Sequence, residues 1–272
     1  MKNLSLDTIK TGYDYLCEMC TIKTDFNAFG PRENPITKRV SYIINEFVKI
    51  NIPYTLDMFD CNNILTTTVG KNKLVNVIVK FDSINSSTES ILFLAHHDIK
   101  NIFSENAQDN SASVCNLLDL CRQLKNIRLN KNIIIAFTDG EEVGGIGARR
   151  LAMLINKGNF RNVLHTINLE LTGLGTELWV GAGSYTQLSK DKIQKWVNLG
   201  ATIKQIPFSD TAILESEGIK SVCIGLLPKN EIDLNFPPTW SLCHSTNDTF
   251  DKTNKVDMSL LVKLLLHVTD SE

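Results

Sequence analysis

The sequence contains no apolar run long enough to cross a membrane. A membrane-spanning helix needs about 18–20 consecutive apolar residues, whereas the longest runs here, at 91–95 and 260–266, are short. The N-terminus has Lys2 but no apolar segment behind it, so no signal peptide is expected. The net charge is only −2, which leaves no basic excess for nucleic acid. Neither a membrane nor a nucleic acid is therefore an expected partner.

Cysteine occurs in an odd number and at irregular spacing, which argues against a disulfide framework. With seven cysteines and no signal peptide, reduced thiols in a cytoplasm are the plain interpretation. Cys17 and Cys20 form a C-x-x-C, but they lie in an amphipathic helical pattern and no second pair completes a zinc site. We interpret them as half-buried helix residues, because free cysteine packs as a small hydrophobic side chain. We expect a cytoplasmic location.

Length and composition indicate an ordinary globular protein. The chain has 272 residues, of which 43% are hydrophobic and 21% are charged. A chain of this size can bury about 70–75% of its unfolded surface without disulfides or metals. We expect residues 1–272 to form a single domain, with a helical N-terminal segment, 1–50, packed on it.

The hydrophobic pattern alternates between strands and helices over most of the chain. The predicted strands span residues 63–69, 74–81, 90–95, 132–138, 163–169, 176–180, 201–206 and 221–226. The predicted helices span residues 5–20, 35–50, 111–126, 142–157, 187–199, 209–217 and 257–268. Continuous apolar strands between helices predict an α/β fold, a three-layer α/β/α sandwich with a mixed, centrally parallel sheet. In such sheets ligands bind at the carboxyl ends of strands.

A histidine and two acids lie near the end of the strand predicted at 90–95. His96 and Asp98 fall on one side of an extended chain, because side chains alternate along a strand. A carboxylate beside an imidazole is also the arrangement that orients a metal-binding histidine. Asp109 stands just before the helix at 111–126, where it could instead be a simple helix cap.

Three more acids follow two further predicted strands. Glu141 and Glu142 come after the strand at 132–138, and Glu170 directly follows the strand at 163–169. Acids at a helix N-terminus, or at an exposed strand end, are an ordinary alternative. Adjacent glutamates with glycines behind them also suit a general base beside a metal ligand.

A second histidine, His244, lies in a loop with Asp248 four residues later. Each of these segments has an ordinary interpretation by itself, but together they supply two imidazoles and three carboxylates for metal binding. That ligand set suits zinc, cobalt or manganese. Two such ions bridged by one carboxylate would activate a water molecule and polarise an amide.

The motifs resemble those of the M28 zinc exopeptidases, a family of dizinc aminopeptidases. The resemblance covers residues 60–270, and the similar stretches run in the family's order: LAHHD (94–98), AQDNSAS (107–113), TDGEEVGGIGAR (138–149), INLELTG (167–173), SDTAILESEGIKSV (209–222) and CHSTNDTFD (243–251). It implies an α/β/α fold of the zinc-peptidase type, two Zn²⁺ ions per chain (with Co²⁺ or Mn²⁺ as substitutes) and a peptide substrate.

The resemblance also implies a role for each residue at the site. His96 would bind one zinc. Asp98, counted among the catalytic residues, would orient the imidazole of His96. Asp109 would bridge both ions. Glu141 would be the general base that takes a proton from the attacking water.

The remaining implied roles complete the two metal sites. Glu142 and His244 would bind the other zinc, with Asp248 supporting His244. Glu170 stands where most aminopeptidases of the family carry aspartate. The longer side chain is still a competent ligand, but it leaves the metal preference and the occupancy of the second site open.

Substrate contacts are the least specific part of the prediction. Asp210 begins a predicted helix and could bind the α-amino group of a substrate, or simply cap that helix. Four aromatic residues could line a pocket, although lone aromatics more often serve packing: Tyr185, Phe208, Phe236 and Trp240.

Three functions stay open at this point. The first is a dizinc aminopeptidase that acts on oligopeptides or dipeptides. The second is a glutaminyl-cyclase-like acyltransferase on the same fold, an enzyme class that resembles this family but uses a single zinc. The third is a non-catalytic binding module. The N-terminal helices could cover the site or mediate a homo-oligomer.

Overall fold

A computed structural model describes residues 9–22, 32–61, 72–182, 188–206 and 208–271 of the chain. Within these residues, eight strands form one sheet in the order β1-β2-β4-β3-β5-β8-β6-β7. The strands are β1 (Tyr54–Cys61), β2 (Asn72–Phe81), β3 (Glu89–His96), β4 (Asn132–Thr138), β5 (Asn162–Leu169), β6 (Glu177–Ala182), β7 (Thr202–Gln205) and β8 (Ser221–Leu227).

The four central strands are parallel, and the strand on each side of them is antiparallel to its central neighbour, while β7 pairs parallel with β6 at the edge. Strands β4, β3, β5 and β8 run parallel to one another, whereas β2 and β6 pair antiparallel with β4 and β8. The predicted mixed, centrally parallel sheet is therefore confirmed. The helices are α1 (Gly12–Cys20), α2 (Lys38–Lys49), α3 (Ala112–Leu124), α4 (Ile146–Asn156), α5 (Lys190–Asn198), α6 (Asp210–Ser216) and α7 (Lys255–Ser271). Short helical turns are η1 (Ala107–Ser111), η2 (Pro238–Leu242) and η3 (Phe250–Lys252).

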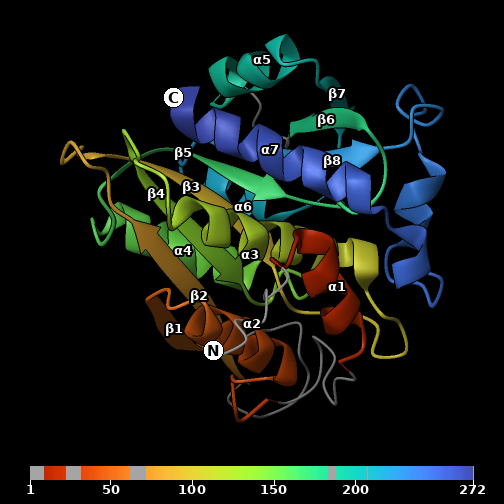
Figure 1. The fold of residues 1–272 in the computed structure, drawn as a ribbon, viewed down its shortest axis with the longest axis horizontal. Helices are drawn as coiled ribbons and strands as arrows, with labels where there is room; N and C mark the ends of the chain where they lie inside the picture. Colours follow the sequence, from red (N-terminus) through yellow and green to blue (C-terminus); the bar gives the residue numbers. More distant parts are fainter. Residues whose placement is uncertain (1–8, 23–31, 62–71, 183–187, 207, 272) are drawn as a thin grey trace, which may run out of the picture.

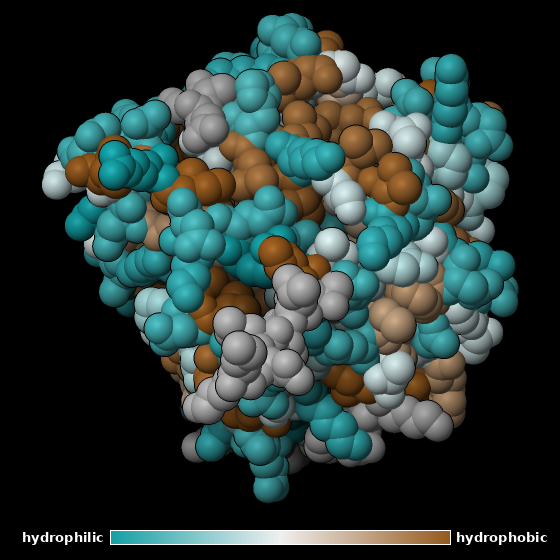
Figure 2. Space-filling model, in the orientation of Figure 1, coloured by the Kyte–Doolittle hydropathy of each residue, from teal (hydrophilic) through white to brown (hydrophobic). Residues whose placement is uncertain are grey.

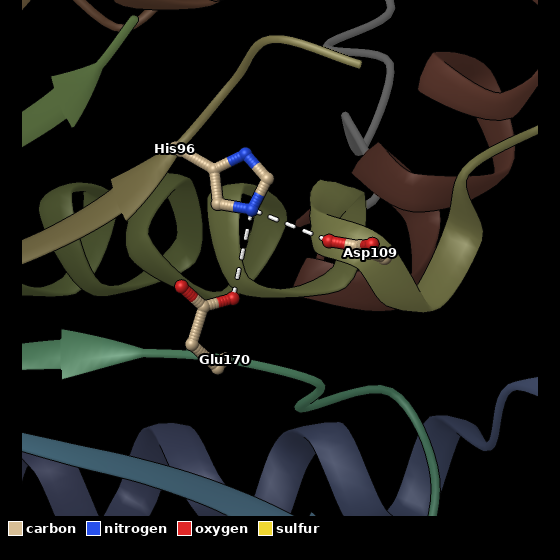
Figure 3. Close-up of side chains that lie close together, drawn as sticks. All are labelled: His96, Asp109 and Glu170. Atoms are coloured by element: carbon tan, nitrogen blue, oxygen red, sulfur yellow. Dashed lines mark ion pairs between the residues drawn. The ribbon is translucent and has the colours of Figure 1, made fainter. Parts of the chain in front are cut away.

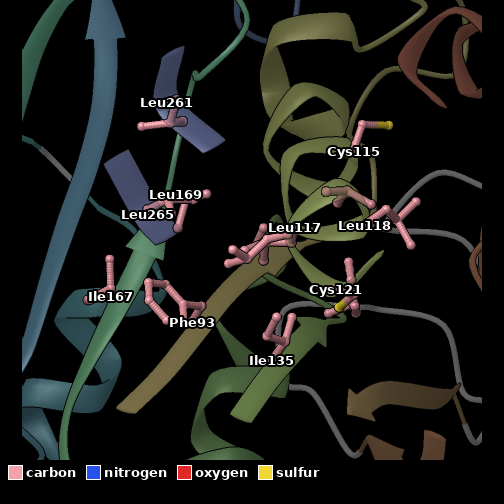
Figure 4. Close-up of a cluster of buried hydrophobic side chains, with 14 of the residues drawn as sticks. Phe93, Cys115, Leu117, Leu118, Cys121, Ile135, Ile167, Leu169, Leu261 and Leu265 are labelled. Atoms are coloured by element: carbon pink, nitrogen blue, oxygen red, sulfur yellow. The ribbon is translucent and has the colours of Figure 1, made fainter. Parts of the chain in front are cut away.

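Helices cover both faces of the sheet, as the continuous apolar strands require. In strand β3, Ile91 and Phe93 enter the larger hydrophobic cluster under α3 and α7, while Leu92 and Leu94 enter a second cluster under α4 and α6. Figure 4 shows part of the larger cluster, where side chains of α3, α7 and the central strands meet. The two buried faces give the predicted α/β/α layering.

The N-terminal helices belong to the same core as the sheet. Leu16 of α1 and Phe47 of α2 are fully buried in the cluster that contains Phe93 and Phe137. The segment before β1 is therefore packed on the sheet.

Figure 2 shows hydrophilic side chains over much of the face seen in Figure 1, with apolar ones gathered in the region of α7 and α5.

Several predicted boundaries shift by a few residues, one strand was not predicted, and one predicted strand falls outside the described residues. Helix α4 begins at Ile146 and not at residue 142, because Gly144 and Gly145 have φ values of 106° and 66° that a helix does not allow. Strand β1 (Tyr54–Cys61) was not among the predicted ranges, since its residues are mostly half-buried or exposed. The strand predicted at 63–69 lies outside the described residues.

Candidate metal centre

The site lies where three adjacent parallel strands end. Strand β3 is hydrogen-bonded to β4 on one side and to β5 on the other. His96 is the last residue of β3, Glu141 and Glu142 follow β4, and Glu170 follows β5. Neighbouring parallel strands end at one edge of the sheet, so these side chains converge.

Three of the predicted ligands form one cluster. His96 Nε2 lies 3.3 Å from Asp109 Oδ1 and 3.6 Å from Glu170 Oε2, and all three side chains are largely buried. Figure 3 shows both carboxylates on the Nε2 side of the His96 ring, with Asp109 coming from the turn before α3 and Glu170 from the end of β5. One nitrogen and two oxygens at this spacing could hold a divalent ion.

A second cluster shares Asp109 with the first. His244 Nε2 lies 3.2 Å from Asp109 Oδ2 and 3.0 Å from Glu142 Oε2. Asp109 therefore presents one carboxylate oxygen to each cluster. This is the arrangement of a carboxylate that bridges two metal ions. The five predicted ligands, His96, Asp109, Glu142, Glu170 and His244, thus come together in the structure.

The two imidazoles and the shared carboxylate perturb one another. Burial favours the neutral form of Asp109, but hydrogen bonds from His244 and His96 outweigh it and hold the pKa of Asp109 well below its usual value. Hydrogen bonds to Asp109 and Glu142 raise the pKa of His244 to about 9. Oε1 of Glu142 is buried without a hydrogen-bond partner among the described residues. An unpaired buried carboxylate oxygen beside two imidazoles fits a cation-binding site.

Glu141 lies beside the two clusters and belongs to neither. It lines a cavity of about 590 Å³ together with the metal-ligand candidates. Burial, and then the neighbouring acids Glu170, Asp210 and Asp98, raise the pKa of Glu141, while His96 lowers it. A carboxylate that faces a cavity without engaging the ligand clusters is free to exchange protons.

Asp98 links two of the strand ends. Its Oδ1 lies 3.4 Å from His96 Nδ1, the ring nitrogen that points away from the clusters. Its carboxylate oxygens also accept hydrogen bonds from the backbone N–H groups of Glu141 and Glu142, at 3.1 Å each. Asp98 therefore orients His96 and also holds the loop that carries both glutamates. His97 points elsewhere, with Nε2 at 3.0 Å from the carbonyl oxygen of Val75 in β2.

Asp248 has contacts that differ from the predicted support of His244. Its carboxylate oxygens accept hydrogen bonds from the backbone N–H groups of Gln108 and Asp109, at 2.7 and 3.0 Å. Burial raises the pKa of Asp248 to about 6, and these two hydrogen bonds oppose that rise. Asp248 thus holds the Asp109 turn, because the loop after His244 folds back onto that turn and not onto the imidazole.

Asn110 is a site residue that the sequence did not reveal. Its Nδ2 donates to the carbonyl oxygen of Leu169 at 2.8 Å, and its Oδ1 accepts from the backbone N–H of Leu171 at 3.4 Å. These two backbone groups flank Glu170. An asparagine before a helix usually predicts a cap, so nothing in the sequence indicated this long-range contact.

Asp210 is buried and hydrogen-bonded to the end of β4. It is fully buried, its Oδ2 accepts a hydrogen bond of 2.6 Å from Thr138 Oγ1, and burial raises its pKa to about 7. The cavity lining includes its neighbour Ser209 but not Asp210. The predicted contact with an α-amino group stays a prediction, and the first turn of α6 directs the side chain toward Thr138 at the end of β4.

Aromatic and aliphatic side chains form one wall of the cavity. Phe208 and Trp240 belong to it, as predicted, together with Trp179, Ile206 and Leu171. The rings of Trp179 and Trp240 meet edge to face with their centroids 5.8 Å apart. Two other predicted pocket residues are not part of the described wall: Phe236 is 88% exposed, and Tyr185 lies outside the described residues.

The chain matches known proteins in sequence. The sequence model of peptidase family M28 matches residues 76–269. A vacuolar membrane protease of Clavispora lusitaniae is 26% identical over 217 residues, which cover 79% of this chain and 20% of that protein. The chain spans a fifth or less of the length of the curated relatives that it matches.

Solved structures share the fold at low sequence identity. A leucine aminopeptidase precursor from Bacteroides thetaiotaomicron has a TM-score of 0.72 and 21% identity, with 96% of each chain covered. A glutaminyl cyclase from the same organism has a TM-score of 0.73 and 21% identity, with 96% of this chain and 97% of that chain covered. Identities this low establish the fold and leave the reaction open.

Location and assembly stay predictions. Within the described residues, no helix is both long and apolar enough to cross a bilayer. The curated relatives are named as proteases of the vacuolar membrane. A cytoplasmic location and a homo-oligomer are therefore still to be tested.

Proposed function

Because the chain belongs to peptidase family M28, we propose that it is a metal-dependent aminopeptidase that removes N-terminal residues from peptides. The observation that carries this proposal is the pair of ligand clusters that share Asp109 at one cavity. Glu141 lines the same cavity and is free of both clusters. The candidate ligands, the candidate base and the cavity therefore lie together, which supports the proposal.

The ligand atoms fit two zinc ions. His96, Asp109 and Glu170 would hold one ion, and Asp109, Glu142 and His244 would hold the other. Imidazole and carboxylate groups are ordinary zinc ligands, and the unpaired Glu142 Oε1 leaves an additional oxygen for binding. Bound there, divalent ions supply Lewis-acid chemistry, which acidifies water and polarises a carbonyl group.

Glu141 is assigned the proton transfer. Its carboxylate takes a proton from the attacking water and then delivers it to the nitrogen of the departing amine. Asp98 holds the backbone N–H groups of residues 141 and 142, which fixes Glu141 relative to the Glu142 ligand. The base is thus placed by the same side chain that orients His96.

We assign to the apolar wall the binding of the side chain of the N-terminal residue that is removed from the substrate. Trp179, Phe208 and Trp240 present aromatic surface to the cavity beside Glu170. Burial of a large apolar side chain against such a wall contributes about 1.5–3 kcal/mol. We therefore expect leucyl or phenylalanyl substrates to be preferred over alanyl or glutamyl ones.

The test combines metal content with hydrolysis for the wild type and Glu141→Gln. Wild type should contain two zinc ions per chain and release N-terminal residues from leucyl anilides and dipeptides. The variant should keep its metal and lose about 10²–10⁴-fold in kcat, the usual contribution of a general base. Glu177→Gln, at a half-buried position at the start of β6, is the control and should behave as wild type. A Glu141→Gln variant that retains its metal and its activity would contradict the assignment.

A second candidate is cyclisation of an N-terminal glutaminyl residue, favoured by the fold match to a glutaminyl cyclase over 96% of the chain. In that reaction Glu141 would move a proton from the α-amino group to the departing ammonia. A glutaminyl peptide distinguishes the two. Release of free glutamine indicates an aminopeptidase, and release of ammonia with a cyclised peptide indicates the cyclase.

A further inference from the structure

Helix α2 carries a buried arginine that the proposed chemistry does not use. Arg39 is the second residue of α2 and is 3% exposed. It lies before residue 76, where the match to the family begins. A buried guanidinium is costly unless hydrogen bonds and nearby charge compensate for the lost water. Its partners therefore indicate why a charge is kept at this position.

The guanidinium joins the two loops that carry His96 and Asp109. Nε of Arg39 donates to the carbonyl oxygen of His97 at 3.0 Å, and Nη2 donates to Ser111 Oγ at 2.8 Å. Ser111 Oγ in turn donates to the carbonyl oxygen of Asn106 at 2.5 Å, which closes the Asp109 turn. A rigid planar fork with two donors is suited to holding two acceptors at a fixed spacing.

Charge also favours arginine here. Arg39 interacts electrostatically with Asp98 and Asp248, the two buried carboxylates that hold the ligand loops. A guanidinium stays protonated in proteins, so a positive charge lies near both carboxylates. The guanidinium thus bridges the two loops by hydrogen bonds and places a positive charge near the two carboxylates that hold them.

We propose that Arg39 is a positioning residue for the metal centre, which fixes the spacing between His96 and Asp109 from outside the region that the family model matches. The N-terminal segment is then part of the metal-binding unit. This inference rests on the proposed metal-dependent function, so its test measures zinc binding and not hydrolysis.

The experiment compares full-length wild type with Arg39→Met, Arg39→Lys and Arg150→Met. Zinc affinity is measured by competition with a chromophoric chelator, at a temperature where circular dichroism shows every variant to be folded. Arg39→Met should bind zinc about 10- to 100-fold more weakly, the usual effect of losing a partner behind the ligands. The zinc affinity of Arg39→Lys should lie between those of wild type and Arg39→Met, because lysine keeps the positive charge but lacks the planar guanidinium with its two donors.

Arg150 is the matched control. It makes a two-pronged ion pair with Asp57 through Nε and Nη2 and lies on α4, under the opposite face of the sheet. Arg150→Met should lower the unfolding stability and leave zinc affinity unchanged. A purely structural Arg39 would behave in the same way, so a folded Arg39→Met with wild-type zinc affinity would overturn the proposal.

Two further outcomes are decisive. If Arg39→Met does not fold, Ser111→Ala replaces it as the test. This variant removes one acceptor of the fork and should weaken zinc binding several-fold, whereas unchanged affinity in Ser111→Ala would refute the positioning role. If wild type itself binds no zinc, the proposed function fails together with the inference.

Discussion

Gly225 lies where the sheet and the site are packed tightly against each other. It lies in β8 opposite Trp179 of β6. A Cβ added at Gly225 would stand 2.1 Å from the carbonyl oxygen of Glu170 and 2.4 Å from Cζ2 of Trp179. Glu170 is a metal-ligand candidate and Trp179 is part of the apolar wall, so Gly225→Ala would press on both. We predict a loss of activity that exceeds the loss of stability.

The size of the effect follows from these distances. Real Cβ contacts are essentially never shorter than 3.0 Å, so the Glu170 backbone must move by roughly 0.9 Å. Overpacking of this kind typically costs about 1–3 kcal/mol of unfolding free energy. A site tolerates displacements of only about 0.5 Å, and a misplacement of about 1 Å can cost a factor of about 100 in rate. We expect kcat/KM to fall about 100-fold in a protein that still folds.

The assay pairs urea unfolding with hydrolysis of leucyl anilide and with zinc affinity. Gly200→Ala is the control, because a Cβ there meets nothing within 4 Å and the cost comes only from a φ of +97°. It should lower stability by about 1 kcal/mol without affecting zinc binding or kcat/KM. The reasoning is refuted if Gly225→Ala changes kcat/KM by less than twofold while Gly200→Ala behaves as expected.

Three further predictions concern the cavity, a buried acid and the metals. Trp240→Ala should reduce kcat/KM for leucyl substrates about 10-fold more than for alanyl substrates, measured on matched anilides; equal losses would exclude Trp240 from the side-chain pocket. Glu215 is buried with Oε2 unpaired among the described residues, and burial raises its pKa. The folded state therefore holds the proton at a pH where the unfolded state has released it, so stability falls as pH rises from the ordinary glutamate pKa through the raised value. Glu215→Gln should be less sensitive to pH in that window and more stable than wild type at pH 7.5 by urea unfolding. Removal of metal by a chelator should lower unfolding stability by about 4 kcal/mol relative to protein with zinc at a thousand times Kd, and no shift in thermal unfolding would argue against a native metal site.

The central strands were predictable because β3, β4 and β8 are nearly continuous apolar runs bounded by turn residues, and β5 is largely apolar. Strand β4 (Asn132–Thr138) has the predicted bounds, since Asn132–Thr138 is apolar on both faces and Asp139-Gly140 ends it. The start of α4 was not predictable by the same means. Two acids followed by glycines are typical of a helix N-terminus. In the structure the backbone turns before α4 begins, which brings Glu141 and Glu142 to the cavity.

The metal-ligand candidates were predictable by residue type, and their supports were not. Histidine and acidic residues that follow strands indicate a binding site, because the carboxyl ends of parallel strands meet at one edge of the sheet. Asn110, Arg39 and Asp248 make contacts across 58 to 140 positions of the chain. Such contacts depend on how loops approach one another, and short-range patterns carry no information about that approach.

The supporting contacts form one connected network that links all the segments carrying ligand candidates. Asp98, in the segment that follows His96, accepts a hydrogen bond from the loop of Glu142. Asp248, in the loop that follows His244, accepts one from the turn of Asp109. Asn110 then links that turn to the strand end that carries Glu170, and Arg39 links it back to the His96 loop. No ligand candidate is therefore positioned by its own loop alone. Displacement of one loop must propagate to the others, because each carries a hydrogen-bond partner that another requires. Metal affinity is then a property of the connected set, and losses from two linking residues in contact, such as Arg39 and Ser111, should not add.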